Sequence, residues 1–144
     1  MENEIIASVT AEVCNEDIAS IGAISVDIKN KLKNVVPRAE DLRRFGICLF
    51  EAEANLSIHS IGGTLEIVVT KSAIKVVSRD KGPGIADMNK ALTPGFSTAP
   101  PWARELGFGS GMGLKNIKRL ADNFSIYSSD AGTVLSFEIK INEN

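Results

Sequence analysis

The sequence has few of the residues that build metal centres and disulfides. Its 144 residues include two cysteines and one histidine. Cys14 and Cys48 are far apart in the chain and form no C-x-x-C pair, which argues against a zinc site. We therefore expect two reduced, buried thiols, as is typical of a cytosolic protein.

The sequence also lacks an excess of basic charge and long apolar runs. Its formal net charge is -2, so it has no electrostatic footprint for nucleic acid. No apolar stretch approaches the ~20 residues that a membrane helix needs. The N-terminus, MENEIIASVTAEV, carries acids where a signal peptide needs basic residues. We predict a soluble, cytoplasmic protein with neither nucleic-acid nor membrane partners.

The first half of the chain predicts one strand and two helices. With 44% hydrophobic residues, residues 1–144 fit a single domain. Residues 4–13 alternate as a strand does. Apolar residues then recur at helical spacing to Leu32, after a cap at Asn15 or Asp17 and before Pro37. A second helix is predicted from positions 38–41 to Gly62-Gly63, where both glycines can take positive φ.

The second half predicts two hairpins around a loop and a helix. TLEIVVTK and SAIKVVSR read as an antiparallel hairpin, and residues 81–113 carry turn and loop chemistry. GLKNIKRLADNF, residues 113–124, has the pattern of an amphipathic helix, and FSIYSS and TVLSFEIKI read as closing strands. The fold class that follows is α+β: a two-layer α/β sandwich with a mixed, mostly antiparallel sheet and helices on one face.

The second helix is unusually polar in its middle. At ~100° per residue, Glu51 and Asn55 fall on one side, whereas Glu53 points to the other. Two oxygen donors on one face suit Mg²⁺, which takes one or two protein oxygens together with substrate phosphates. The alternative is that both side chains simply face solvent.

Two glycine-bearing stretches are further candidate sites. Asp80 follows a strand and precedes Gly82 and Gly84, so its carboxylate could accept from an exocyclic amine of a flat ring; the alternative is an ordinary Asp-Lys-Gly turn. The second stretch, GFGSGMG, has a glycine at every other position from 107 to 113 and precedes a helix near Leu114. Free N–H groups and the positive dipole end converge there, which predicts a phosphate site. It is neither a P-loop nor G-x-G-x-x-G.

Taken in order, three stretches resemble the boxes of the GHKL (Bergerat-fold) ATPase superfamily, which includes sensor histidine kinases. E-A-E-A-N resembles the N box, D-K-G-P-G the first glycine box and G-S-G-M-G-L the second. Within that superfamily, the small size and the segment from PGFSTAPPWARELGFG onward are most similar to the anti-sigma-factor serine kinases of partner-switching systems. The resemblance covers nearly the whole chain.

The resemblance implies roles for individual residues. Asn55 would hold Mg²⁺ on the ATP phosphates, and Glu51 would be the general base. Asp80 would accept from the adenine amine, with Thr133 supporting that side. Residues 93–113 would form an ATP lid, in which Arg104 would contact the γ-phosphate. The remaining cofactor-binding residues would be Gly82, Gly84, Ile85, Gly107, Gly109, Gly111, Met112, Gly113 and Leu114.

The function that the resemblance implies is an ATP-dependent serine/threonine protein kinase. Its substrate would be a serine on a small antagonist (anti-anti-sigma) protein, and its other partner a sigma factor or a signalling phosphatase; a homodimer is compatible with it.

One alternative is an ATP-dependent binding module that sequesters its partner without phosphorylating it, which would not need Glu51. Another is a detached histidine-kinase catalytic domain, which is less favoured because no helix with a phosphoacceptor histidine precedes the domain. A eukaryotic-type kinase lacks support, since V-A-I-K, H-R-D and D-F-G are absent.

Overall fold

The computed structural model describes residues 4–14, 20–58, 62–80, 113–129 and 132–141. Secondary structure covers most of these ranges. In chain order the elements are β1 (Ile5–Val13), α1 (Ala23–Leu32), α2 (Ala39–Ile58), β2 (Gly63–Thr70), β3 (Ala73–Asp80), α5 (Gly113–Leu120), β4 (Asn123–Ser129) and β5 (Gly132–Lys140).

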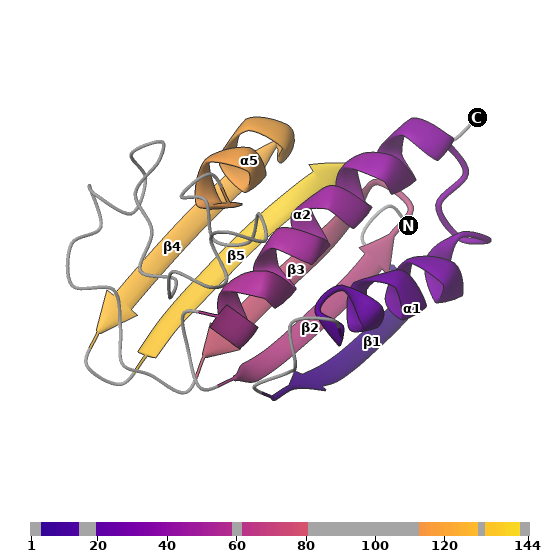
Figure 1. The fold of residues 1–144 in the computed structure, drawn as a ribbon. Coiled ribbons are helices and arrows are strands. Elements are labelled where there is room, and N and C mark those ends of the chain that lie inside the picture. The colour runs from indigo at the N-terminus through magenta and orange to yellow at the C-terminus, as the bar shows by residue number, and fades with distance from the viewer. Residues whose placement is uncertain (1–3, 15–19, 59–61, 81–112, 130–131, 142–144) are drawn as a thin grey trace.

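The strands form one sheet with the order β1-β2-β3-β5-β4. The three helices of the described chain cover one face of this sheet (Figure 1). This arrangement confirms the α+β fold with helices on one face. Every strand pair within the described ranges is antiparallel. The sequence analysis predicted a mixed, mostly antiparallel sheet, so this part of the sheet is more regular than predicted.

Both predicted hairpins are present, but α5 is shorter than predicted. The helix ends at Leu120, whereas the sequence pattern extended it to Phe124. The Asp122 N–H donates to Glu138 O at 2.9 Å, and Asp122 Oδ2 accepts from the Lys140 N–H at 2.7 Å. Pairing with β5 therefore replaces helical hydrogen bonds from Asp122 onward, and Phe124 lies in β4 opposite Phe137.

The first helix begins later than predicted. α1 starts at Ala23, and its N-cap residue is Gly22, which has no side chain to make a capping hydrogen bond. Asn15 and Asp17, the predicted cap residues, lie outside the described residues, and Glu53 on α2 binds the N–H groups at the start of α1, as described below. The second helix runs over 20 residues as expected. None of the described helices combines the length and apolar character needed to cross a bilayer.

Gly62 and Gly63 lie where the chain passes from α2 into β2, and they serve different purposes. Gly62 has a φ of 105°, as predicted, and its N–H donates to Leu56 O at 3.2 Å. Gly63 is not among the positive-φ glycines of the described chain and begins β2 instead. A Cβ at Gly63 would lie 2.0 Å from Arg79 O, so this glycine permits close approach of β3 rather than an unusual φ.

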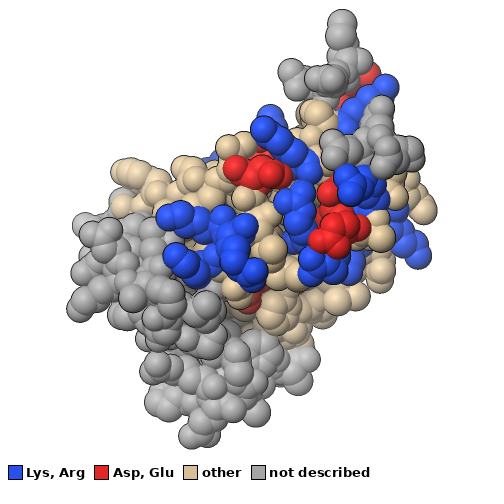
Figure 2. Space-filling view, turned by 90° about the horizontal axis from the view of Figure 1, so that it is seen from above, with Lys and Arg blue, Asp and Glu red and all other residues tan. Residues whose placement is uncertain are grey.

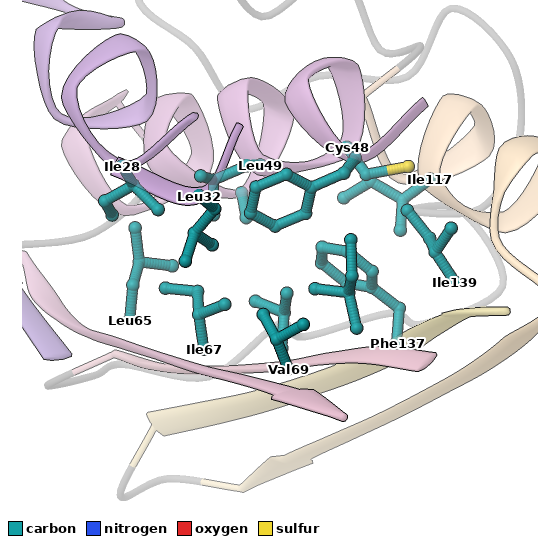
Figure 3. Packing of buried hydrophobic residues seen from close by; sticks show 14 of the residues in the cluster. Ile28, Leu32, Cys48, Leu49, Leu65, Ile67, Val69, Ile117, Phe137 and Ile139 are labelled. Atoms are coloured by element: carbon teal, nitrogen blue, oxygen red, sulfur yellow. The ribbon is translucent and has the colours of Figure 1, made fainter. Parts of the chain in front are cut away.

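Apolar side chains from all three helices and the sheet meet in one core. Figure 3 shows Leu65, Ile67 and Val69 of β2 pointing toward the helices. The labelled partners on the other elements are Ile28 and Leu32 of α1, Cys48 and Leu49 of α2, Ile117 of α5, and Phe137 and Ile139 of β5. Cys48 is buried as expected, whereas Cys14 is exposed, contrary to the prediction that both thiols are buried.

Candidate functional site

The face of α2 that turns toward α5 carries Glu51 and Asn55. A Cβ built on Gly113, the first residue of α5, would lie 3.5 Å from Asn55 Oδ1 and 3.6 Å from Glu51 Oε2. One glycine thus faces two side-chain oxygens that are four residues apart on α2. Both side chains are half-buried, which argues against the alternative in which they simply face solvent.

Asn116, also on α5, contacts the same face. Its Nδ2 donates to Glu51 Oε2 at 3.0 Å, and its Oδ1 lies 3.5 Å from Arg119 Nη2. The sequence analysis did not single out Asn116. The signal available in the sequence was its position three residues after Gly113, which places both on one side of a helix.

Glu53 faces the opposite way, as its position in the sequence predicted. Its side chain is fully buried. Oε2 accepts from the Gly22 N–H at 2.9 Å, and Oε1 accepts from the Ser25 N–H at 2.8 Å and from Ser25 Oγ at 2.6 Å. The carboxyl group therefore caps the N-terminus of α1, where unpaired N–H groups and the helix dipole favour an anion.

Asp80 and Thr133 meet at the ends of neighbouring strands. The β3–β5 register pairs Arg79 with Val134, which brings Thr133 beside Asp80. The Thr133 N–H donates to Asp80 Oδ1 at 2.8 Å, and Thr133 Oγ1 is 3.0 Å from Ser128 Oγ. The two residues that the resemblance assigned to the adenine side therefore touch.

The Asp80 pair lies next to the end of α2. The Gly62 N–H donates to the carbonyl oxygen of Leu56, the residue directly after Asn55. Gly63, which follows Gly62, pairs with Asp80 between β2 and β3. The C-terminal part of α2 accordingly ends near the tip of β3 (Figure 1). The oxygen donors on α2 and the carboxylate of β3 thus lie at the same end of the molecule.

Positive charge accumulates on α5. Lys115, Lys118 and Arg119 are exposed, and the first turn of α5 carries no acid. None of the three makes an ion pair with another residue that the structure describes. Figure 2, which looks down on the top of the molecule as drawn in Figure 1, shows many Lys and Arg side chains on this surface, with Asp and Glu side chains among them. Such a surface attracts anionic ligands or acidic proteins.

Cys48 lies one turn before Glu51 on α2. Burial raises the pKa of its thiol to about 11, and the charge of Glu51 acts in the same direction, while Arg44 and Arg119 oppose it. The thiol is therefore protonated at neutral pH and is not a nucleophile.

Most of the predicted cofactor-binding residues, and the predicted catalytic Arg104, lie outside the described chain. Gly113 and Leu114 are within it, and Leu114 packs against the core. Those outside it are Gly82, Gly84, Ile85, Arg104, Gly107, Gly109, Gly111 and Met112. Their assignments stay predictions.

The donor set around Gly113 fits a magnesium nucleotide. An amide oxygen and a carboxylate oxygen are hard donors, and the glycine leaves open the space that a Cβ would fill. Among the described residues, no group of three or more His, Cys, Asp or Glu could hold a metal by itself. A cation here would need phosphate oxygens and water as further ligands, which is the usual coordination of Mg²⁺ in nucleotide sites.

The sequence matches known ATPase-domain and kinase proteins. Residues 15–139 match the family described as histidine kinase-like ATPase domain. Over 92 residues the chain is 33% identical to the serine/threonine-protein kinase RsbT of Bacillus subtilis, an alignment that spans 61% of this chain and 63% of that protein. It is 26% identical to the anti-sigma F factor of Bacillus thuringiensis over 142 residues, which are 94% of this chain and 90% of that factor.

Solved structures show the same fold at lower identity. The catalytic domain of the histidine kinase ThkA superposes with a TM-score of 0.52 at 18% identity, covering 95% of this chain and 97% of that domain. A chain of the SiaB–SiaC complex from Pseudomonas aeruginosa gives a TM-score of 0.53 at 13% identity, with 95% and 91% covered.

Proposed function

The chain belongs to the histidine kinase-like ATPase family, and we propose that it is a Mg²⁺-dependent serine/threonine protein kinase of the partner-switching type. The observation that carries this proposal is the meeting of Glu51, Asn55 and Gly113 beside the Asp80–Thr133 pair. The similarity to RsbT and to anti-sigma F factors supports the kinase assignment. Residues 1–144 would act as one domain.

The nucleotide would lie between the strand ends and α5. Asp80 would accept from the adenine amine, with the Thr133 N–H helping to fix the carboxylate. Asn55 Oδ1 would hold Mg²⁺, which when bound neutralises charge on the phosphates. The glycines from 107 to 113 would donate N–H groups to the phosphates, and Arg104 would contact the γ-phosphate.

Glu51 would act on the acceptor hydroxyl. As the serine Oγ attacks the γ-phosphorus and the bond to the β,γ-bridging oxygen breaks, Glu51 would take the hydroxyl proton, and ADP would leave. Positioning and charge neutralisation provide most of the rate in such transfers, and a placed base adds about 10²–10⁴-fold.

The substrate would be a serine on a small antagonist protein, and the second partner a sigma factor or a signalling phosphatase. The names of the relatives, anti-sigma F factor and RsbT, motivate this choice. The cationic surface of α5, close to Glu51, would favour a partner with acidic residues near its serine. A homodimer is compatible with this arrangement.

The test is a single-turnover assay with γ-labelled ATP, Mg²⁺ and the proteins that co-purify with the chain in the presence of ATP. We expect label on a serine of one partner and none with Glu51→Ala, although nucleotide affinity is retained. Equal labelling by the variant would remove Glu51 from the mechanism. Partner binding that depends on ATP, without any labelling by the wild type, would instead identify a binding module.

A further inference from the structure

We propose that Asn116 is a positioning residue that fixes the carboxylate of Glu51, an inference that rests on the proposed function. Asn116 lies on α5 and Glu51 on α2, 65 positions apart in the chain, and the hydrogen bond between them is 3.0 Å long. Among the described residues, this is the only side-chain hydrogen bond to Glu51.

The two functional groups of the Asn116 amide have distinct surroundings. The NH₂ group faces the Glu51 carboxylate, and the oxygen faces the Arg119 guanidinium at 3.5 Å. The reverse orientation would place the amide oxygen against a carboxylate oxygen and the NH₂ group against a cation, which is electrostatically unfavourable. Arg119 therefore helps to hold Asn116 in the orientation that donates to Glu51.

The hydrogen bond engages one particular oxygen. Oε2 of Glu51 receives the Asn116 N–H and is also the Glu51 oxygen near the Cβ position of Gly113. No described residue donates to Oε1. With Oε2 held by α5, Oε1 is the oxygen left to receive the proton of the acceptor hydroxyl. A flexible glutamate is thereby restricted before substrate arrives, which is the condition for efficient general base catalysis.

The packing of α5 does not need this bond. Ile117 is fully buried in the core, and Arg44 Nη1 donates to Leu120 O at 2.9 Å, which attaches the end of α5 to α2. Removing the Asn116 amide should consequently leave α5 in place. This separates a positioning role from a structural one.

The first experiment compares Asn116→Ala with Asn123→Ala in the single-turnover transfer assay. Asn123 is an exposed residue of β4 whose Nδ2 donates to Glu138 Oε1 at 2.7 Å, and it takes no part in the proposed site. We expect Asn116→Ala to lower the transfer rate by about 10- to 100-fold with the dissociation constant for Mg-ATP within about twofold of the wild type. Asn123→Ala should keep the wild-type transfer rate. A rate loss in Asn116→Ala that is matched by weaker nucleotide binding would overturn the inference.

The second experiment needs no nucleotide. The side-chain amide of Asn116 gives a pair of ¹H–¹⁵N cross-peaks, and we expect this pair to move in Glu51→Ala and to stay in place in Asn123→Ala. A pair that ignores Glu51→Ala would overturn the hydrogen bond itself.

The outcomes separate the inference from the proposed function. If Glu51→Ala is inactive while Asn116→Ala keeps the wild-type rate, the inference alone fails. If Glu51→Ala is as active as the wild type, the proposed function fails and the inference fails with it.

Discussion

Glu51 and Glu53 are two residues apart on α2 and have opposite surroundings. Glu53 is fully buried, and three donors from the start of α1 bind its two oxygens. Glu51 is half-buried, and within the described chain one side-chain donor binds one of its oxygens. The difference indicates that the carboxyl group of Glu53 stabilises the fold, whereas that of Glu51 has capacity left for a ligand.

The largest effect is expected from Glu53→Ala. This change leaves the N–H groups of Gly22 and Ser25 without their acceptor in the interior, so we expect the free energy of unfolding to fall by about 3 kcal/mol or more. Urea denaturation followed by circular dichroism measures it. Glu51→Ala should lower the same quantity by less than about 1 kcal/mol. Equal losses for the two variants would break the comparison.

Glu53→Gln and Ser25→Ala sharpen the same point. The first keeps the size of the side chain and one acceptor oxygen, and the second removes one hydroxyl donor. Both should lie between the wild type and Glu53→Ala, with Ser25→Ala losing about 1 kcal/mol. A Glu53→Gln variant as stable as the wild type would show that the second carboxyl oxygen contributes nothing.

The next effect concerns Asp80, on the side of the molecule that we propose is open to ligand. Asp80→Asn retains an oxygen that can accept the Thr133 N–H, so stability should change by less than about 1 kcal/mol. The new NH₂ group would face the adenine amine, donor against donor, and weaken ATP binding by about tenfold or more. Calorimetry with Mg-ATP measures this affinity, and an unchanged value would exclude Asp80 from the adenine site.

Gly113→Ala should give a smaller effect, and of opposite sign for stability and for binding. The added Cβ lies at an ordinary contact distance, 3.5 Å, from Asn55 Oδ1. Alanine favours the helix over glycine, so stability should rise by up to about 1 kcal/mol. The same methyl group occupies the space between the two oxygen donors and should weaken Mg-ATP binding. Parallel changes in stability and affinity would contradict a ligand space at this position.

The sequence predicted those parts of the molecule that depend on local pattern. The spacing of Glu51, Glu53 and Asn55 on one helix was sufficient to separate the two faces, and two β-rich runs joined by a short polar turn identified the hairpin of β2 and β3. The cap of α1 could not be found this way. It comes from a glutamate about 30 positions later, and local capping rules consider only residues near the helix start.

The Asn116–Glu51 contact escaped sequence analysis for the same reason. A side chain on α5 meets α2 only after both helices have packed on the sheet, and no spacing rule connects positions 65 residues apart. The end of α5 was placed too late because Ala121 and Phe124 continue its apolar pattern. They do contact the core, but Phe124 does so from a strand that pairs with β5.

The smallest expected effect concerns the two thiols. It tests whether α2 stays packed against α5 at Cys48, one turn before Glu51. Cys48 is buried with a pKa raised to about 11, whereas Cys14 is exposed. At pH 8, iodoacetamide should therefore modify Cys14 and spare Cys48 in the native protein, and should modify both in urea, as mass spectrometry of peptides would show. Because the folded state keeps the Cys48 proton to higher pH than the unfolded chain does, the thiol also lowers stability as pH rises from about 9 toward 11. Rapid native modification of Cys48 would mean that α5 separates from α2 readily, and the contact between Asn116 and Glu51 would then be too transient to position a base.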